Sequence, residues 1–122
     1  MRNTILLASL TLAAACGSSS YTAPTGTTNG PPGGTTVPTV TTSVNIAGTA
    51  FNPAPIQVSP GAVVTWTNSD GFNHNVTFSS AAIGAIGDFA TGAKSLTMPT
   101  VVGTYAYHCT IHPSMTGTVD VK

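Results

Sequence analysis

Residues 103–117 read GTYAYHCTIHPSMTG, and this stretch decides what kind of fold the chain adopts. A thiol, an imidazole and a thioether follow one another at intervals of three residues, at Cys109, His112 and Met115. Together they form a soft donor set, of the kind that binds transition metals. The residues before Cys109 alternate in the manner of a β-strand. The stretch therefore predicts a strand that leads into a metal-binding loop.

A further donor lies 35 residues before Cys109, at His74, just after the turn-forming residues 68–71. His74 shares strand parity with Val76 and Phe78, and Cys109 shares it with two tyrosines, so both donors should point into a core. Two inward donors from separate strands can meet at one end of a sheet structure. They would lie there beside the loop that carries His112 and the methionine.

Turn signals recur every several residues from Ser43 to the C-terminus, with short alternating or apolar runs between them. This rhythm, without a convincing helix, predicts an all-β sandwich. The segment Ala81–Ala90 could contain one helical turn, although its two glycines argue against a helix there. The expected strands are Val44–Ala50, Ile56–Val58, Ala62–Thr67, Asn75–Ser79, Lys94–Met98, Thr104–Cys109 and Thr116–Val121.

The chain of 122 residues has only six charged side chains, three of each sign, and no Glu. This leaves no basic face to neutralise phosphates, so the composition argues against nucleic-acid binding. It also excludes a solvated helical bundle, whose surface would need Glu, Lys and Arg. Without Arg2 the side chains sum to a charge of −1, because two lysines oppose three aspartates. Long-range electrostatic steering of partners should therefore be weak.

The N-terminus begins with one positive charge and continues through eleven uncharged residues, Ile5 to Ala15. Eleven helical residues rise only about 16 Å, which is too short to cross a membrane, so residues 1–15 are predicted to be a secretory signal. Residues 12–17 (LAAACG) resemble the lipobox of bacterial lipoproteins, which implies lipid attachment at Cys16. An ordinary cleavage site that leaves a free cysteine is the alternative. Gly17 favours the outer membrane over the inner one.

Of the 26 residues from Gly17 to Thr42, 21 are Gly, Pro, Ser or Thr. Such a tract cannot bury enough apolar surface to offset the entropy of ordering, so it is predicted to be a disordered tether. The sequence thus divides into a signal (1–15), a lipidated cysteine with its tether (16–42) and one domain (43–122). We expect a periplasmic or cell-surface lipoprotein of the bacterial cell envelope, held to the membrane through Cys16.

Residues 43–122 resemble a cupredoxin, a small blue-copper electron carrier, and most closely the amicyanin and plastocyanin branch. The spacing of Cys, His and Met fits the short ligand loop of amicyanin. The resemblance implies a cupredoxin-like Greek-key β-sandwich of about seven to eight strands. It rests on the segments FNP (51–53), VVTWTN (63–68), HNV (74–76), GTYAYHC (103–109) and MTG (115–117).

The resemblance also implies a ligand set for one mononuclear copper ion that alternates between Cu(I) and Cu(II). The equatorial ligands would be His74, Cys109 and His112, and Met115 would be the axial ligand. Asn75 would tie the two ligand-bearing loops together through Thr110. His108 has the opposite parity to Cys109 and should face away from the metal.

One residue departs from the amicyanin and plastocyanin pattern, which usually has proline immediately before the second histidine. Here the residue is Ile111, which keeps a backbone N–H. We expect that group to donate to the Cys109 sulfur, which would withdraw electron density from the thiolate and favour the reduced metal.

The favoured function is a type 1 copper protein that shuttles single electrons and is not an enzyme. Three histidines cannot build a trinuclear copper centre, and the chain has no nucleophile motif. Redox protein partners should dock near His112 on a monomer, against an apolar rim of Phe51, Phe72, Ile111 and Pro113. The alternative is a copper-handling module that stores or passes the metal with the same ligands.

Overall fold

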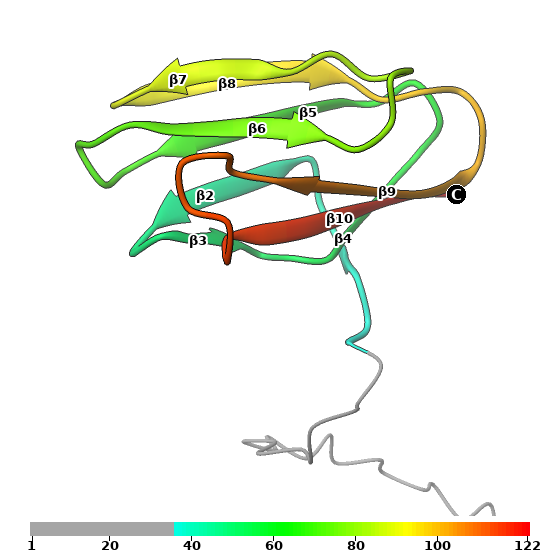
Figure 1. Ribbon diagram of the computed structural model, residues 1–122. Helices are drawn as coiled ribbons and strands as arrows, with labels where there is room; N and C mark the ends of the chain where they lie inside the picture. Colours follow the sequence, from blue (N-terminus) through cyan, green and yellow to red (C-terminus); the bar gives the residue numbers. More distant parts are fainter. Residues whose placement is uncertain (1–35) are drawn as a thin grey trace, which may run out of the picture. The chain divides into compact units, whose positions relative to one another are not determined.

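The computed structural model describes residues 36–122, which form two mixed β-sheets packed against each other (Figure 1). Within this range there are ten strands and no helix, and hence no helix that could cross a membrane. The all-β class expected from the turn rhythm is confirmed. The signal, Cys16 and most of the tether lie outside the described residues.

The larger sheet has six strands in the order β1-β4-β10-β9-β6-β7. β4 pairs in parallel with both β1 and β10, whereas the remaining neighbours are antiparallel. This sheet contains both strands that lead to or carry metal donors, β6 and β9. The bounds are β1 Thr39–Val40, β4 Ile56–Val58, β6 His74–Phe78, β7 Ile86–Phe89, β9 Gly103–His108 and β10 Thr116–Val121.

The smaller sheet has four strands in the order β3-β2-β5-β8. β2 pairs in parallel with β5, and the other two pairs are antiparallel. Burial alternates along β2, β3 and β5, as expected where one face of a sheet covers a core. The bounds are β2 Ser43–Ala47, β3 Ala50–Asn52, β5 Val63–Asn68 and β8 Gly92–Thr97.

An aromatic cluster fills the core between the sheets. Trp66 of β5 is fully buried, and its ring lies 5.5 Å from that of Tyr107 and 6.0 Å from that of Phe78, both with edge-to-face geometry. Edge-to-face pairs of this kind add about 0.5–1.5 kcal/mol each beyond the area they bury. Since Tyr107 precedes Cys109 by two residues, this packing fixes the strand that delivers the thiol.

The structure differs from the expected strands at three places. The run Val44–Ala50 divides into β2 and β3, because Gly48 and Thr49 adopt left-handed conformations with φ of 59° and 57° and reverse the chain. The strand β7 was not expected. Only its two end residues are buried, and such a short pattern is not recognisable in the sequence. Residues 39 and 40 of β1 fall inside the expected tether, and Thr39 N–H bonds to Pro55 O at 3.1 Å.

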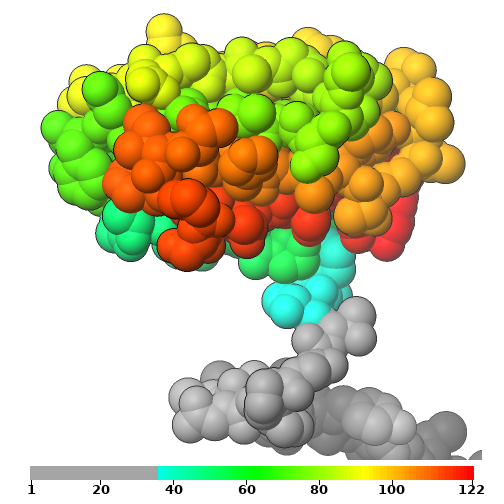
Figure 2. All heavy atoms as spheres, in the orientation of Figure 1, coloured from blue at the N-terminus to red at the C-terminus, as the bar shows by residue number. Residues whose placement is uncertain are grey.

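The loops that follow β5 and β9 lie at the same end of the sandwich, and the C-terminus lies at the other end (Figure 1). In the space-filling view the orange loop after β9 forms part of the surface beside the green loop that precedes β6 (Figure 2). The fold therefore brings two segments, far apart in the sequence, together at one end.

Candidate metal centre

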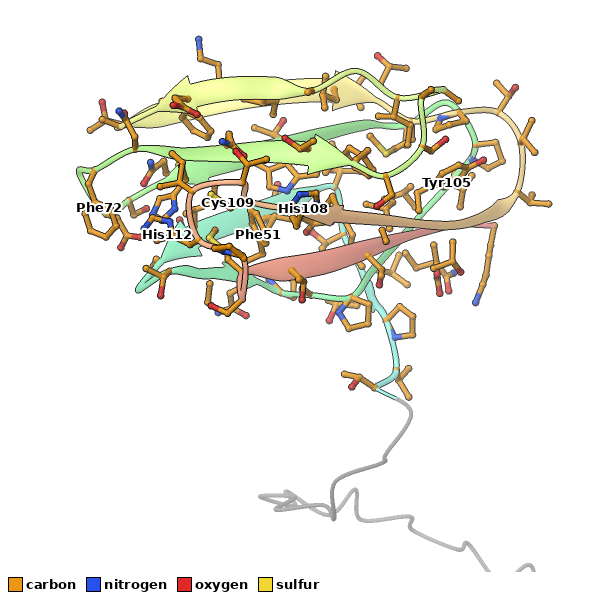
Figure 3. The ribbon with its side chains drawn as sticks, in the orientation of Figure 1. Phe51, Phe72, Tyr105, His108, Cys109 and His112 are labelled. Carbon is orange, nitrogen blue, oxygen red and sulfur yellow. The ribbon has the colours of Figure 1, made fainter. Side chains whose placement is uncertain are left out.

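Three donor side chains converge at this end of the sandwich. The ligand atoms of His74, Cys109 and His112 all lie within 4.8 Å of one another. The sulfur of Cys109 is 4.0 Å from Nδ1 of His74 and 3.8 Å from Nδ1 of His112. His74 and Cys109 are fully buried and His112 is half-buried. Cys109 and His112 lie next to each other at this end of the sandwich (Figure 3). The cluster is thus enclosed by protein except on the side of His112.

Cys109, His112 and a further donor, Met115, lie on one short loop between β9 and β10. Cys109 N–H donates to Met115 O at 3.0 Å, which closes the loop at its base. Met115 N–H donates to His112 O at 2.8 Å, which forms a turn inside it. Met115 is buried, with 2% of its surface exposed. These bonds hold all three donors of the loop on one compact segment, as the sequence spacing suggested.

Asn75 joins the two ligand-bearing segments, as expected from the resemblance. Its Nδ2 donates to Thr110 Oγ1 at 2.7 Å, and its Oδ1 accepts from Thr110 N–H at 2.9 Å. The same Nδ2 also donates to Asp88 Oδ1 on β7 at 2.9 Å. Asp88 could not be identified from the sequence, because it lies on β7, the strand that was not expected. Asp88 holds the amide in the orientation that serves Thr110.

Asp70 is a second residue at the site that was not expected from the sequence, in which it is part of a turn-forming run. Asp70 Oδ2 lies 2.8 Å from Nε2 of His74, on the opposite edge of the ring from Cys109. Gly48 N–H donates to the same carboxylate at 2.7 Å. This backbone bond, together with His74, lowers the pKa of Asp70 below its ordinary value despite some desolvation. The spacing of four residues before His74 was the only available signal.

The surface around His112 is apolar, and its composition corrects one prediction. Phe72 and Ile111 are 47% and 42% exposed, and Pro113 is exposed as well. The ring of Phe72 lies 5.0 Å from that of His74 and 6.1 Å from that of His112. Phe51, however, is buried against Tyr107 at 4.8 Å, because the alternation of β3 turns its middle residue inward. The rim therefore excludes Phe51.

The hydrogen bond expected from Ile111 N–H to the Cys109 sulfur is not present among residues 36–122. The polar atoms within hydrogen-bonding range of that sulfur are the Nδ1 atoms of the two histidines. The preceding N–H, that of Thr110, is directed to Asn75 instead. The path of the loop is thus set by Asn75 and not by the thiolate.

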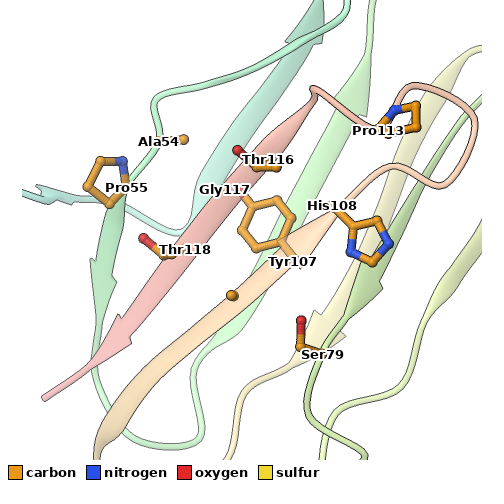
Figure 4. Close-up of a pocket in the computed structure, with 10 residues that line it drawn as sticks. Ala54, Pro55, Ser79, Tyr107, His108, Pro113, Thr116, Gly117 and Thr118 are labelled. Atoms are coloured by element: carbon orange, nitrogen blue, oxygen red, sulfur yellow. The ribbon is translucent and has the colours of Figure 1, made fainter.

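His108 is the last residue of β9 and is not part of the donor cluster, as its parity predicted. It is half-buried and lines a surface hollow of about 580 Å³ together with Pro113, Thr116 and Ser79 (Figure 4). The hollow lies on the face of β9 and β10 beyond the donor cluster. His108 is therefore not placed to share a metal with Cys109.

Comparison with known families agrees with this geometry. The sequence model of the family described as "Copper binding proteins, plastocyanin/azurin family" matches residues 38–122, which include all the donors described above. The chain belongs to the plastocyanin/azurin family of copper-binding proteins. The cupredoxin fold implied by the sequence resemblance is thereby confirmed.

Individual relatives of this chain are named amicyanin or plastocyanin. The chain is 39% identical over 87 residues to amicyanin of Paracoccus denitrificans, a match that spans 65% of this chain and 63% of that protein. It is 36% identical over 93 residues to amicyanin-alpha of Methylorubrum extorquens strain AM1, covering 70% of this chain and 75% of the relative. Plastocyanin of Scenedesmus fuscus is 31% identical over 84 residues, covering 59% and 86% of the two chains.

Solved structures of amicyanin variants have the same fold. The reduced form of a tryptophan-to-tyrosine variant aligns with a TM-score of 0.60 at 35% identity, covering 66% of this chain and 80% of that one. A Cu(I) form of a methionine-to-alanine variant aligns with the same values. This cupredoxin therefore shares the fold of proteins that have been described with copper.

The donor set in this cupredoxin fits one mononuclear copper ion. A thiolate and two imidazoles that converge within 4.8 Å, with a buried thioether on the same loop, match the His₂Cys site with a weak axial Met. The donor atoms of the buried residues His74 and Cys109 face the same point. Hard cations such as Mg²⁺ prefer oxygen ligands, so a site of nitrogen and sulfur donors does not suit them.

Proposed function

We propose that this domain is a type 1 copper protein that carries single electrons between redox partners and performs no chemistry on a substrate. The observation that carries the proposal is the convergence of His74, Cys109 and His112 on one point at the end of a rigid sandwich. When bound there, copper supplies a one-electron couple between Cu(I) and Cu(II). The relatives named amicyanin and plastocyanin support the same function.

The chain's own residues give this site the properties an electron carrier needs. His74 and Cys109 are fully buried, so water is kept away from two of the donors. Asn75 and the two backbone bonds of the ligand loop hold the donors in place independently of any metal. A site held in one geometry has little to rearrange between oxidation states, which lowers the cost of each electron transfer.

We place the docking surface around His112, because it is the only donor of the three that reaches the surface. Phe72, Ile111 and Pro113 surround it with exposed apolar side chains. No lysine or aspartate of the described residues belongs to this rim. A redox partner should therefore bind through apolar contact, with a polar periphery that contributes little electrostatic guidance.

We further propose that the domain is a monomeric envelope lipoprotein, tethered through Cys16 by the Gly-, Pro-, Ser- and Thr-rich segment. The support is the lipobox-like run at residues 12–17 and the composition of residues 17–42. The test is fractionation of cells that express the full chain. Wild type should sediment with the membranes and Cys16→Ser should not; a soluble wild type would contradict the anchor.

An electron carrier and a copper-handling module differ in whether the metal leaves. The protein is loaded with copper, cycled between oxidised and reduced states, and challenged in each state with a chelator specific for that state. An electron carrier should keep its copper in both states over many cycles. Rapid loss of Cu(I) to the chelator, or transfer of it to a second copper-binding protein, would favour copper handling and contradict the proposal.

A further inference from the structure

Among residues 36–122, Asp70 is the one charged side chain that forms a hydrogen bond with a donor residue. It lies in the loop between β5 and β6, and its Oδ2 is 2.8 Å from Nε2 of His74. An ionised carboxylate only accepts hydrogen bonds, so Nε2 must carry the proton of the neutral ring. Nδ1 then keeps its lone pair, and this is the atom that faces Cys109 at 4.0 Å.

The carboxylate is itself held by the turn between β2 and β3. Gly48 N–H and Thr49 N–H donate to its two oxygens at 2.7 and 3.4 Å. Both residues have left-handed φ values, and successive N–H groups in such a turn form a concave binding site for an anion. Thr49 is not glycine, so this backbone is strained, and the contact with Asp70 helps to maintain it.

The loop that carries Asp70 is fixed from its other side by Asn68. Asn68 Oδ1 accepts from Asp70 N–H at 2.9 Å, and Asn68 Nδ2 donates to Phe72 O and Phe89 O at 2.8 and 2.7 Å. Asn68 is buried, with 4% of its surface exposed. The position of the carboxylate is thus determined by bonds that do not involve the histidine.

The geometry points to Asp70 as a positioning residue for the metal site: it selects the His74 tautomer that leaves Nδ1 free to bind copper. His74 is fully buried, so bulk solvent does not reach Nε2, and the carboxylate of Asp70 is the acceptor that the fold supplies there. Without the carboxylate, the proton could reside on Nδ1 and block the lone pair that a metal needs. The role in copper binding rests on the proposed function, whereas the tautomer itself does not.

The tautomer is measured in the copper-free protein by the ¹⁵N chemical shifts of the His74 ring, in mildly alkaline buffer. Wild type should show a proton on Nε2 and none on Nδ1. In Asp70→Asn the oxygen of the amide can still accept from Gly48, while its NH₂ group faces His74 and favours a proton on Nδ1. Asp120→Asn is the matched control, because Asp120 bonds to Thr104 and Lys122, away from the donors.

A wild-type ring protonated on Nδ1 would overturn the inference, even if Asp70→Asn did not fold. An unchanged His74 tautomer in a folded Asp70→Asn protein would overturn it too. A general loss of structure would not move the proton from one ring nitrogen to the other, so the spectrum separates positioning from stability.

Copper affinity provides the second readout. Loss of an outer partner of a ligating histidine typically weakens metal binding by about 10- to 100-fold. We expect such a loss in Asp70→Asn, partial recovery in Asp70→Glu, and wild-type affinity in Asp120→Asn. Equal affinity in Asp70→Asn and Asp120→Asn would contradict the inference. If wild type bound no copper, the proposed function would fail while the tautomer result still stood.

Discussion

Asn75 and Thr110, 35 residues apart in the sequence, hold each other through two hydrogen bonds of 2.7 and 2.9 Å. Each residue directly follows a metal-donor residue, His74 in one case and Cys109 in the other. The pair thus fixes the separation of the two segments that carry the buried donors. Because neither bond involves the donors themselves, the site is organised by the polypeptide before any metal binds.

Removal of this connection should destabilise the copper-free protein. Asn75→Ala leaves Thr110 N–H without its acceptor in a part-buried region, which should lower the free energy of unfolding by about 2 kcal/mol. Thr110→Ser is the matched control, because it keeps both bonds and should change stability by less than about 0.5 kcal/mol. Urea denaturation measures both. Equal stability of Asn75→Ala and wild type would mean that the pair does not hold the loops.

Gly117 on β10 is constrained by the aromatic core and not by its own backbone. A Cβ at this position would lie 2.5 Å from the hydroxyl oxygen of Tyr107, which is far inside van der Waals contact. Because Tyr107 is packed against Trp66, it has little freedom to move. Gly117→Ala should therefore cost about 1–3 kcal/mol in thermal or urea unfolding. Gly87→Ala, where nothing lies within 4 Å, is the control and should be close to neutral.

Tyr107 should make stability fall at alkaline pH. Burial raises its pKa to about 12, against an ordinary value of 10. The unfolded chain therefore loses this proton first, so the contribution is fully present below pH 10 and is lost as pH rises through about 12. The difference should reach roughly 2 kcal/mol. In Tyr107→Phe the free energy of unfolding, measured with urea, should fall less between these pH values. Plots of the free energy of unfolding against pH that run parallel for the two proteins would contradict the role of Tyr107.

The same substitution tests the packing of the hydroxyl. Within the described residues, the hydroxyl oxygen of Tyr107 is buried and has no hydrogen-bond partner. A buried polar group without a partner is unfavourable, so Tyr107→Phe should be neutral or more stable by up to about 1 kcal/mol at pH 7. A destabilisation of more than about 1 kcal/mol would show that the hydroxyl is satisfied in solution.

Electron self-exchange between two copies should depend only weakly on salt. The docking rim of Phe72, Ile111 and Pro113 carries no charge, so the rate should change by less than about threefold between low and moderate ionic strength. Ile111→Lys places like charges opposite each other, which should slow exchange at low salt. Added salt should restore the rate, because it screens the repulsion. NMR line broadening gives the rate. A tenfold dependence in wild type would contradict an uncharged docking surface.

Much of the site could be predicted because its donors are unusual residues in fixed order. Cys109, His112 and Met115 lie on one loop, so their spacing alone brings them together. The inward direction of His74 could be predicted from its parity with Val76 and Phe78, and burial confirms that direction. The role of Asn75 came from the resemblance to cupredoxins, and its bonds to Thr110 agree with it. Local sequence thus defined both the loop and the strand ends that converge on it.

The rest depended on tertiary contacts that sequence spacing does not show. Asp70 appeared as an ordinary turn residue, because its partners Gly48 and Thr49 lie on another hairpin. Asp88 belongs to a strand with only two buried residues, which is too weak a pattern to detect. Phe51 was assigned to the rim although the reversal at Gly48 and Thr49 turns it into the core.

We infer that one copper ion binds to His74, Cys109, His112 and Met115, with Cys109 as a thiolate. The most direct measurement is the visible spectrum as Cu(II) is added to the copper-free protein. We expect an intense charge-transfer band that saturates at one equivalent of Cu(II) in wild type and is absent in Cys109→Ser. A colourless or weakly coloured wild-type complex, or an equally intense band in Cys109→Ser, would contradict it.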